Sequence, residues 1–260
     1  MPNSPPDSPL RFGICGCGGI SNLHAKCLKD LEAEGIAKLV AGAEPKPERA
    51  AEWSAKHGVP VHGTLAELLR RDDIDVVTIT SPSGLHGQQA IDIANSGRHV
   101  LCEKPLDVLL AKADEAIAAA KKNSVVLSGI FQQRFAPGPQ KVKRAVEAGA
   151  LGRIVFVHAE TPWYRAQSYY DADKTWRGTW ALDGGVLGNQ SPHMIDRLLW
   201  LGGDLEEVIS ATCAEGLDRD IEAETLAVAT LRLKGGALGT LTGTTLAYDG
   251  LPQRVLICGT

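Results

Sequence analysis

The sequence lacks the features that mark membrane proteins, secreted proteins and nucleic-acid-binding proteins. Its longest apolar stretches fall far short of the roughly 18 residues that span a bilayer. No run of five like charges occurs, and 27 Lys and Arg against 31 Asp and Glu give a net charge of -4, without a basic stripe for nucleic acid. The first ten residues lack the basic and apolar regions of a signal peptide. We therefore expect a cytoplasmic protein that binds neither membranes nor nucleic acid.

Cysteines are present, but no C-x-x-C pair occurs among the six. Cys15 and Cys17 are two residues apart, so in a strand their side chains would point to opposite faces. A metal site at this pair is one interpretation. Small buried thiols in a reducing cytoplasm fit the spacing better, and we expect no metal.

Glycine is in excess, with 28 residues among 260 and no three-residue period of the kind found in collagen. The length allows one or two domains, and 44% apolar residues are enough to form a core without disulfides or a metal. Clusters of glycine therefore need a local explanation.

Two halves with different patterns follow a proline-rich tail at 1–9 that we expect to be disordered. Strands and helices alternate with short connections over 10–126, which predicts a parallel sheet with helices on both faces. Thr64 and Glu67 form a capping-box pattern. Asp107 is expected to cap the alanine-rich helix that follows it.

Residues 127–260 contain several β-rich segments and few helices. The segment TLAVATLRL–KGG–ALGTLTG indicates a hairpin, so this half is predicted to be an α/β domain with an open, largely antiparallel sheet. Its strongest helix covers about 193–201. Because the chain ends on the strand-like QRVLICGT, we expect this domain to be incomplete at its C-terminal end.

The glycines of GICGCGGIS lie between a predicted strand and a predicted helix. There Gly16 would form a tight turn, Gly18 would let a pyrophosphate approach the backbone, and Ser21 would replace the usual third glycine. The strand and helix on either side support a dinucleotide site, which glycines alone would not.

Glu44 ends the next predicted strand and bears on the choice of cofactor. Its carboxylate could accept hydrogen bonds from the adenosine ribose and would repel a 2′-phosphate, which favours NAD over NADP. Lys46 and Arg49 keep NADP as an alternative. A surface glutamate without a ligand is another interpretation.

Two further strand ends carry unusual residues, TSPSGLH and CEKP. Ligands of open α/β sheets bind at the carboxyl ends of the strands, so both segments should border the cofactor. Lys104 would lose its proton more easily beside an oxidised nicotinamide and could then share a hydroxyl proton with a substrate. A solvated loop lysine is the alternative.

These motifs, taken together, resemble the Gfo/Idh/MocA oxidoreductases, the family of glucose–fructose oxidoreductase and inositol dehydrogenase. The resemblance runs from Arg11 to Thr260 and rests on GICGCGGIS with His24, SPSGLH, GRHVLCEKP, FQQRF, GALGRI, WRGTW followed by DGG, and NQSPHMID. It implies a dinucleotide-binding Rossmann domain over 10–126 and a substrate and oligomerisation domain over 127–260. It also implies a nicotinamide cofactor, carbohydrate-like substrates, and a homo-oligomer (dimer or tetramer) formed through the second sheet.

Matching the family's motifs assigns catalytic roles to Lys104 and His193, although His193 could also be a helix cap or a packed core residue. Asp196 matches the family's acidic residue one helical turn after that histidine, and it could orient His193 or pair with Arg197 or Arg177. Many members have Asp where this chain has Asn189, and Asn cannot act as a base. The residues expected to contact the cofactor are Gly16, Gly18, Gly19, Ile20, Glu44, Ser81, Pro82, Leu85, His86, Glu103, Lys104 and Gln132.

Six of the 13 aromatic residues lie between positions 163 and 180. This segment is too polar and irregular for a core strand, and a loop of this length is usually functional. Aromatic faces suit the C–H face of a sugar, while arginines and aspartates there could bind hydroxyls or an anionic group. An oligomer contact or a packed cover over the sheet is the alternative. The predicted substrate-binding residues are Arg134, Trp163, Arg165, Trp176, Asn189 and His193.

The leading functional hypothesis is an NAD(P)-dependent dehydrogenase that oxidises a secondary hydroxyl of a sugar, sugar acid, cyclitol or nucleotide-sugar. An NAD-dependent glycoside hydrolase would use the same lysine and histidine. A non-catalytic protein that senses a dinucleotide or a sugar is the third hypothesis, and Lys104 and His193 argue against it.

Overall fold

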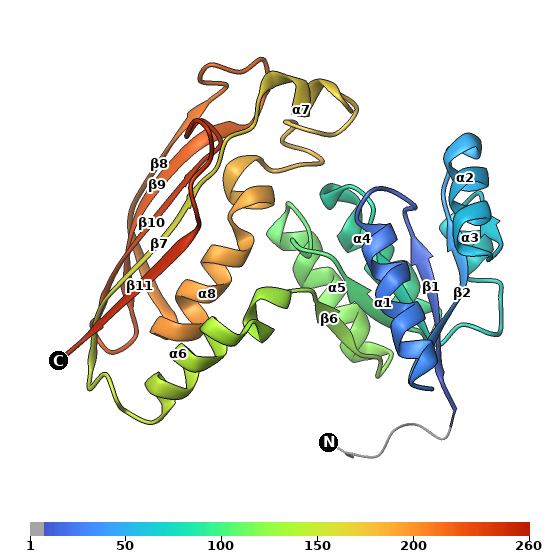
Figure 1. Cartoon of the computed structure of the whole chain (residues 1–260), viewed down its shortest axis with the longest axis horizontal. Coiled ribbons are helices and arrows are strands. Elements are labelled where there is room, and N and C mark those ends of the chain that lie inside the picture. Colours follow the sequence, from blue (N-terminus) through green and yellow to red (C-terminus); the bar gives the residue numbers. More distant parts are fainter. Residues whose placement is uncertain (1–7) are drawn as a thin grey trace. The chain divides into compact units, whose positions relative to one another are not determined.

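Two sheets organise the chain, which divides into two units after Ile130. The computed structural model describes residues 8–260, so residues 1–7 of the predicted disordered tail lie outside the described part. Figure 1 shows the first sheet among its helices and the second sheet with α8 along one face.

The first unit contains a six-stranded parallel sheet in the order β3-β2-β1-β4-β5-β6, which confirms the predicted sheet. Its strands are β1 (Leu10–Cys15), β2 (Ala37–Ala43), β3 (Val61–His62), β4 (Val76–Ile79), β5 (His99–Cys102) and β6 (Leu127–Gly129). Its helices are α1 (Ser21–Ala33), α2 (Pro47–His57), α3 (Leu65–Leu68), η1 (Ser83–Leu85), α4 (His86–Asn95) and α5 (Leu110–Lys122).

Alternate residues of β1 enter two separate hydrophobic clusters. Ile14 packs in one with residues of α1 and α2, including Trp53. Its neighbour Cys15 packs in the other with residues of α4 and α5, including Ile93. Because successive strand residues point to opposite faces, helices cover both faces of this sheet. Each fully buried large aliphatic side chain in these clusters contributes about 2 kcal/mol to folding.

Local signals set the ends of several helices. Helix α2 begins at Pro47 and is followed by its C-cap, Gly58, whose φ of 72° is left-handed. Thr64 and Glu67 form the predicted capping box at α3, with a Glu67 N–H to Thr64 Oγ1 distance of 3.2 Å. The prediction that Asp107 caps the following helix is wrong, because α5 begins only at Leu110. The Asp107 carboxylate instead accepts the N–H groups of Leu109 and Gly87, which ties this loop to the first turn of α4.

The second unit contains a five-stranded sheet in the order β11-β7-β10-β9-β8. Its strands are β7 (Ile154–Pro162), β8 (Leu205–Glu215), β9 (Glu224–Leu233), β10 (Leu238–Thr244) and β11 (Arg254–Gly259). Only the β7–β10 pair is parallel, so the prediction of an open, largely antiparallel sheet is confirmed. The β9–β10 pair is the expected hairpin. The helical segments are η2 (Gln132–Phe135), α6 (Pro137–Glu147), α7 (Gln167–Asp171), the π-helix η3 (Val186–Gln190) and α8 (Pro192–Gly202).

One face of the second sheet packs on α8. Met194 and Leu198 of the helix are buried against Val157 and Leu241 of the strands. On strand β8 most residues are exposed, including Leu205, so apolar side chains of this sheet also face solvent.

Cys15 and Cys17 are buried, and burial raises the pKa of each thiol to about 12. Both are therefore neutral thiols at ordinary pH and poor metal ligands. Within residues 8–260 no group of three His, Cys, Asp or Glu side chains is arranged to hold a metal ion.

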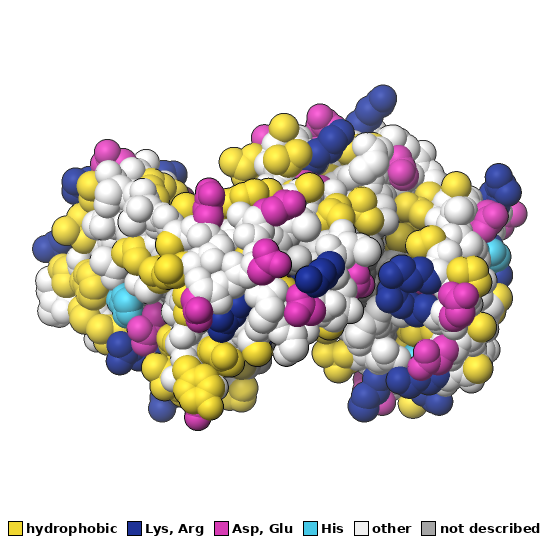
Figure 2. Space-filling model, turned by 90° about the horizontal axis from the view of Figure 1, so that it is seen from above, with side chains coloured by type: hydrophobic (Ala, Val, Ile, Leu, Met, Phe, Trp, Pro, Cys, Tyr) yellow, Lys and Arg dark blue, Asp and Glu magenta, His cyan; other side chains and the backbone are white. Residues whose placement is uncertain are grey.

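Charged side chains of both signs share the surface of the molecule. Figure 2 shows Lys and Arg interspersed with Asp, Glu and hydrophobic side chains on the face that it presents. No helix in the described part of the chain is long and apolar enough to cross a membrane.

Candidate functional site

Four strands of the first sheet end at the same level. Cys15, the last residue of β1, pairs with Ala43 of β2 and Ile79 of β4, and Ile79 pairs with Cys102 of β5. The residues that follow these strand ends therefore share one edge of the sheet. They are Gly16, Glu44, Thr80 with Ser81, and Glu103 with Lys104.

The glycine turn has the geometry of an anion cradle. Gly16 has a φ of 93°, and a Cβ there would lie 2.7 Å from the backbone nitrogen of Ser81. By contrast, Cβ atoms at Gly18 and Gly19 would meet nothing within 4 Å. Helix α1 follows directly and carries no acidic residue in its first turn. Its N-terminal backbone can therefore face a pyrophosphate, and the residues present fit a dinucleotide.

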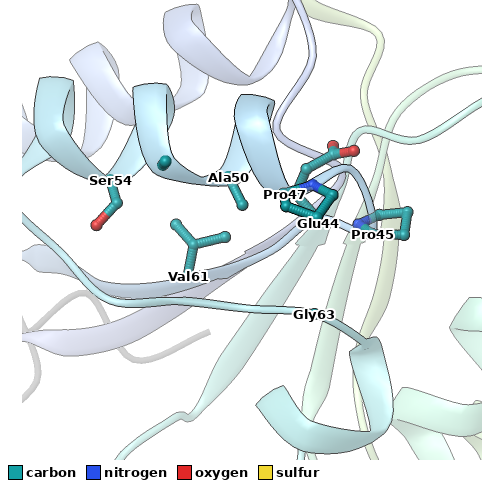
Figure 3. Close-up of a pocket in the computed structure, with 8 residues that line it drawn as sticks. Glu44, Pro45, Pro47, Ala50, Ser54, Val61 and Gly63 are labelled. Atoms are coloured by element: carbon teal, nitrogen blue, oxygen red, sulfur yellow. The ribbon is translucent and has the colours of Figure 1, made fainter.

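Glu44 is buried against this turn and is not a surface glutamate. Its Oε2 accepts the Cys17 N–H at 3.0 Å, and its Oε1 accepts the Lys46 N–H at 3.1 Å. Figure 3 shows the carboxylate pointing away from Ser54 and Val61, which line a cavity of about 400 Å³. Each carboxylate oxygen can accept a second hydrogen bond, so Glu44 suits a ribose hydroxyl.

His86 joins the two unusual strand ends. Its Nε2 lies 2.8 Å from the Ser81 carbonyl oxygen, and its Nδ1 lies 2.7 Å from the Pro105 carbonyl oxygen. The ring is 1% exposed. Both ring nitrogens thus contact protein oxygens, and the direct contact between His86 and the cofactor stays a prediction. His86 ties the loop after β4 to the loop after β5.

Glu103 links Lys104 to the helix that follows the glycine turn. Its Oε1 lies 3.0 Å from Nε2 of His24 in α1, and its Oε2 accepts the Lys104 N–H at 3.1 Å. Burial raises the pKa of Glu103, but His24 and Lys104 outweigh that effect and hold it below its ordinary value. The carboxylate is therefore ionised at neutral pH and fixes the lysine's backbone.

The other predicted cofactor residues lie on the same loops. Ile20 precedes α1 and Leu85 ends η1, and both are exposed. Ser81 donates to Gln89 at 2.6 Å, and Pro82 precedes η1. Gln132 belongs to the second unit, where it begins η2 and is exposed.

His193 is the second residue of α8 and is 7% exposed, with the Phe131 ring edge-on at 6.0 Å. The π-helix η3, which precedes α8, presents Asn189. The Asn189 amide donates from Nδ2 to the carboxylate of Asp183. This contact fixes how the amide is turned, so Asn189 can orient a substrate although it cannot remove a proton.

Two buried carboxylates that the sequence patterns did not single out shape η3. Asp183 also accepts the Gly178 N–H at 2.8 Å, and Glu224 accepts the Leu187 N–H at 2.8 Å. Burial raises the pKa of Glu224, the Leu187 N–H opposes that rise, and Asp183 adds to it. Gly185 has a φ of 69°, and a Cβ there would collide with Glu224. The Asp-Gly-Gly run before NQSPH was the available signal.

Asp196 pairs with neither Arg177 nor Arg197. It forms a bidentate ion pair with Arg134, whose Nε donates at 2.8 Å. The Trp200 ring lies under the same guanidinium, with its centre 5.5 Å from the guanidinium carbon. Asp196 therefore anchors η2 to α8. The substrate contact of Arg134 stays a prediction, and its guanidinium is already bound to the Asp196 carboxylate.

The aromatic segment forms the short helix α7 and irregular turns. Arg165 stacks over Trp163 and Tyr169, and Arg177 stacks over Tyr169 and Trp176. Arg165 also donates to Gln190 of η3 at 3.1 Å. The structure therefore brings Trp163, Arg165 and Trp176 into one cluster, joined through Gln190 to the segment that carries Asn189.

Both units match known family models. Residues 10–131 match the oxidoreductase family with an NAD-binding Rossmann fold, and residues 140–260 match the GFO/IDH/MocA C-terminal domain. The WlbA dehydrogenase from Bordetella pertussis, solved with NADH and UDP-GlcNAcA, is 38% identical with a TM-score of 0.93. That alignment covers 97% of this chain and 72% of WlbA.

Two curated enzymes are similar over most of the chain. Myo-inositol 2-dehydrogenase of Thermotoga maritima is 30% identical over 96% of this chain and 73% of its own length. The NADP-dependent scyllo-inositol 2-dehydrogenase IolU of Bacillus subtilis is 32% identical over 93% and 67%. The two family matches, the Rossmann sheet with its glycine cradle and these relatives confirm the resemblance. The chain belongs to the GFO/IDH/MocA family of NAD(P)-dependent oxidoreductases.

Proposed function

We propose that the chain is a dehydrogenase that oxidises a secondary hydroxyl of a sugar, sugar acid, cyclitol or nucleotide-sugar. The observation that carries the proposal is the fixed position of Lys104 on the strand-end edge that holds the glycine cradle. In this proposal the first unit binds the cofactor, and the second binds the substrate and forms the oligomer. The similarity to WlbA makes nucleotide-linked sugar acids the first substrates to test.

Oxidation of an alcohol removes one proton and one hydride from the substrate. Bound NAD supplies the hydride acceptor. His193 accepts the hydroxyl proton, and Lys104 donates a hydrogen bond to the oxygen as negative charge develops there. Asn189, held by Asp183, orients the hydroxyl-bearing ring. Asn189 is not a base, so the proton passes to His193 while Lys104 stabilises the oxygen.

Glu44 favours NAD over NADP in this proposal. Its buried carboxylate is held beside the glycine turn by two backbone N–H groups. A 2′-phosphate would bring up to two negative charges toward that carboxylate. Arg49, whose Nη1 lies 3.8 Å from Glu44, balances only part of this charge.

The face of the second sheet opposite α8 carries the proposed contact between copies of the chain. Val228 is 42% exposed there and lies between Thr242 and Thr212 of the neighbouring strands. Leu256 is 46% exposed and pairs with His158. Figure 1 shows α8 on one side of this sheet only. A flat sheet face with exposed apolar rows suits burial against a second copy.

The function is tested by following NADH at 340 nm with UDP-GlcNAcA, UDP-GlcNAc, myo-inositol and glucuronic acid, each with NAD or NADP. We expect turnover on at least one of these compounds and a higher kcat/KM with NAD. No turnover, together with hydrolysis of a chromogenic glycoside without NADH accumulation, would replace the proposal with the hydrolase. Binding of cofactor and sugars without either reaction would indicate a sensor.

Lys104→Ala and His193→Ala should each lower kcat by roughly 10²-fold or more, because each removes a group that handles the hydroxyl proton. The dissociation constant for NADH, measured by fluorescence, should change by less than about twofold. Lys122→Ala, at an exposed position of α5, is the matched control. Near-normal kcat in both variants would overturn these roles.

His24→Leu should unfold at a higher pH than the wild type during acid titration. In the wild type the folded-state pKa of Glu103 lies below its unfolded value. Glu103 therefore contributes stability that is complete above the unfolded pKa and is lost as the pH falls through the folded-state pKa. Without His24 the pKa of Glu103 rises, so protonation begins at higher pH. Because Lys104 is then held less firmly, kcat/KM at pH 7 should fall on the order of tenfold.

Circular dichroism gives the acid midpoint of this variant, and the NADH assay gives kcat/KM. His57→Leu removes a histidine bonded to Asn22, also on α1, and should leave kcat/KM unchanged. Equal acid midpoints for His24→Leu and the wild type would refute the role of His24.

Val228→Arg should weaken self-association, since it places a charge in the proposed interface. Light scattering after gel filtration is expected to give a dimer or tetramer for the wild type and a shift toward monomer for Val228→Arg. Val126→Arg, at a 60% exposed position of the first unit, should leave the mass unchanged. A monomeric wild type at micromolar concentration would contradict the proposal.

A further inference from the structure

Two arginines of the second unit stack on the same tyrosine ring. The guanidinium carbons of Arg165 and Arg177 lie 5.0 and 4.1 Å from the ring centre of Tyr169. Trp163 supports Arg165 at 4.9 Å, and Trp176 supports Arg177 at 4.8 Å. Aromatic rings attract each cation, but they do not neutralise it. Two like charges are therefore held on one ring.

Neither cation forms an ion pair with an acid among the described residues. Within residues 8–260 Arg219, which contacts Arg165, pairs with Asp218, whereas no ion pair forms at Arg165 or Arg177. The Nε atoms of both residues are buried and have no hydrogen-bond acceptor among the described residues. A half-buried charge and an unsatisfied donor both raise the free energy of the folded state.

The cluster is a built structure with little freedom to rearrange. Arg165 donates to Oε1 of Gln190 at 3.1 Å, and Gln190 donates from Nε2 to the hydroxyl of Tyr169 at 3.3 Å. Arg219 donates to the carbonyl oxygen of Arg165 at 2.7 Å and fixes the backbone there. The position of the Arg165 guanidinium is thus determined before any ligand arrives, and Arg177 is placed by its contacts with the Tyr169 and Trp176 rings.

Gln190 also places this cluster relative to the reacting groups of the second unit. It is the last residue of η3, directly after Asn189 and three residues before His193. The residue that holds Arg165 therefore lies on the same short segment as Asn189 and His193, so a sugar ring bound by these two residues has the arginine cluster attached to its own binding segment. A carboxylate attached to that ring lies only a few bonds from the reacting carbon.

We propose that Arg165 and Arg177 form a binding site for a carboxylate on the substrate's sugar ring, which makes the substrate a sugar acid. The inference rests on the proposed dehydrogenase function and names its substrate class. The planar, five-donor guanidinium matches a carboxylate better than any other side chain does. The carboxylate would accept hydrogen bonds from both arginines and supply the negative charge that the cluster lacks. The ring faces of Trp163 and Trp176 would flank the apolar side of the sugar.

The test measures binding to the NADH-loaded full chain, so it does not depend on turnover. The probes are UDP-GlcNAcA and UDP-GlcNAc, which share a diphosphate and differ in the carboxylate, and free glucuronic acid, which has only the carboxylate. We expect the wild type to bind UDP-GlcNAcA at least about tenfold more tightly than UDP-GlcNAc. Arg177→Met, which keeps the side-chain stem and removes the charge, should abolish most of that difference.

The neutral probe distinguishes a carboxylate site from a diphosphate site. Arg177→Met should leave the dissociation constants for UDP-GlcNAc and NADH within about twofold of the wild type, and Arg177→Lys should lose less affinity for UDP-GlcNAcA. Arg144→Met, the same change at an exposed position of α6, should have no effect on any probe. Equal losses for both UDP-sugars would assign the arginines to the diphosphate and overturn the proposal. No preference of the wild type for acidic over neutral probes would also overturn it.

These outcomes are distinct from failure of the proposed function. A wild type that oxidises neutral sugars or cyclitols, with kcat/KM unaffected by Arg177→Met, leaves the dehydrogenase in place and removes the carboxylate site. A wild type that oxidises nothing, yet binds acidic sugars in an Arg177-dependent manner, keeps the site and removes the dehydrogenase.

Discussion

The close approach of Gly16 to the backbone of Ser81 is the contact on which the first unit's site depends. A side chain at position 16 would push the glycine turn away from the loop after β4. With the two in contact, a closed chain of links follows: the Ser81 carbonyl to His86, His86 to the Pro105 carbonyl, Lys104 to Glu103, and Glu103 back to His24 of α1. The helix after the glycine turn and the loop that carries Lys104 are thus parts of one connected structure.

The second unit uses buried acids for a similar purpose. Asp183 and Glu224 accept backbone N–H groups around η3, and Asp183 also holds the amide of Asn189. These contacts hold a π-helical turn directly before α8, where an ordinary helix would place Asn189 and His193 differently. The acids do not need to touch a substrate to matter, since they determine the shape of the segment that carries Asn189.

Local patterns were enough to predict much of the fold. The glycine turn, Pro47 at the start of α2, the Thr64–Glu67 capping box and the β9–β10 hairpin depend on residues close in sequence. The roles of other residues depend on distant neighbours and could not be predicted. Asp107 contacts Gly87 instead of capping α5, Asp196 contacts Arg134, and His86 is enclosed by two carbonyl groups. The π-helix η3 had no sequence signal beyond the paired glycines before it.

The three glycines of the cradle differ in the space that each offers to a side chain. At Gly16 both the left-handed backbone and the neighbouring Ser81 exclude a side chain, so any substitution there disturbs the scaffold itself. Gly18 and Gly19 face open space, so a small side chain at either position alters only the surface offered to the cofactor. A redesign of cofactor preference therefore starts at Glu44, because a side chain at position 18 would fill the space that the glycine turn leaves open for a pyrophosphate, and position 16 has to remain glycine.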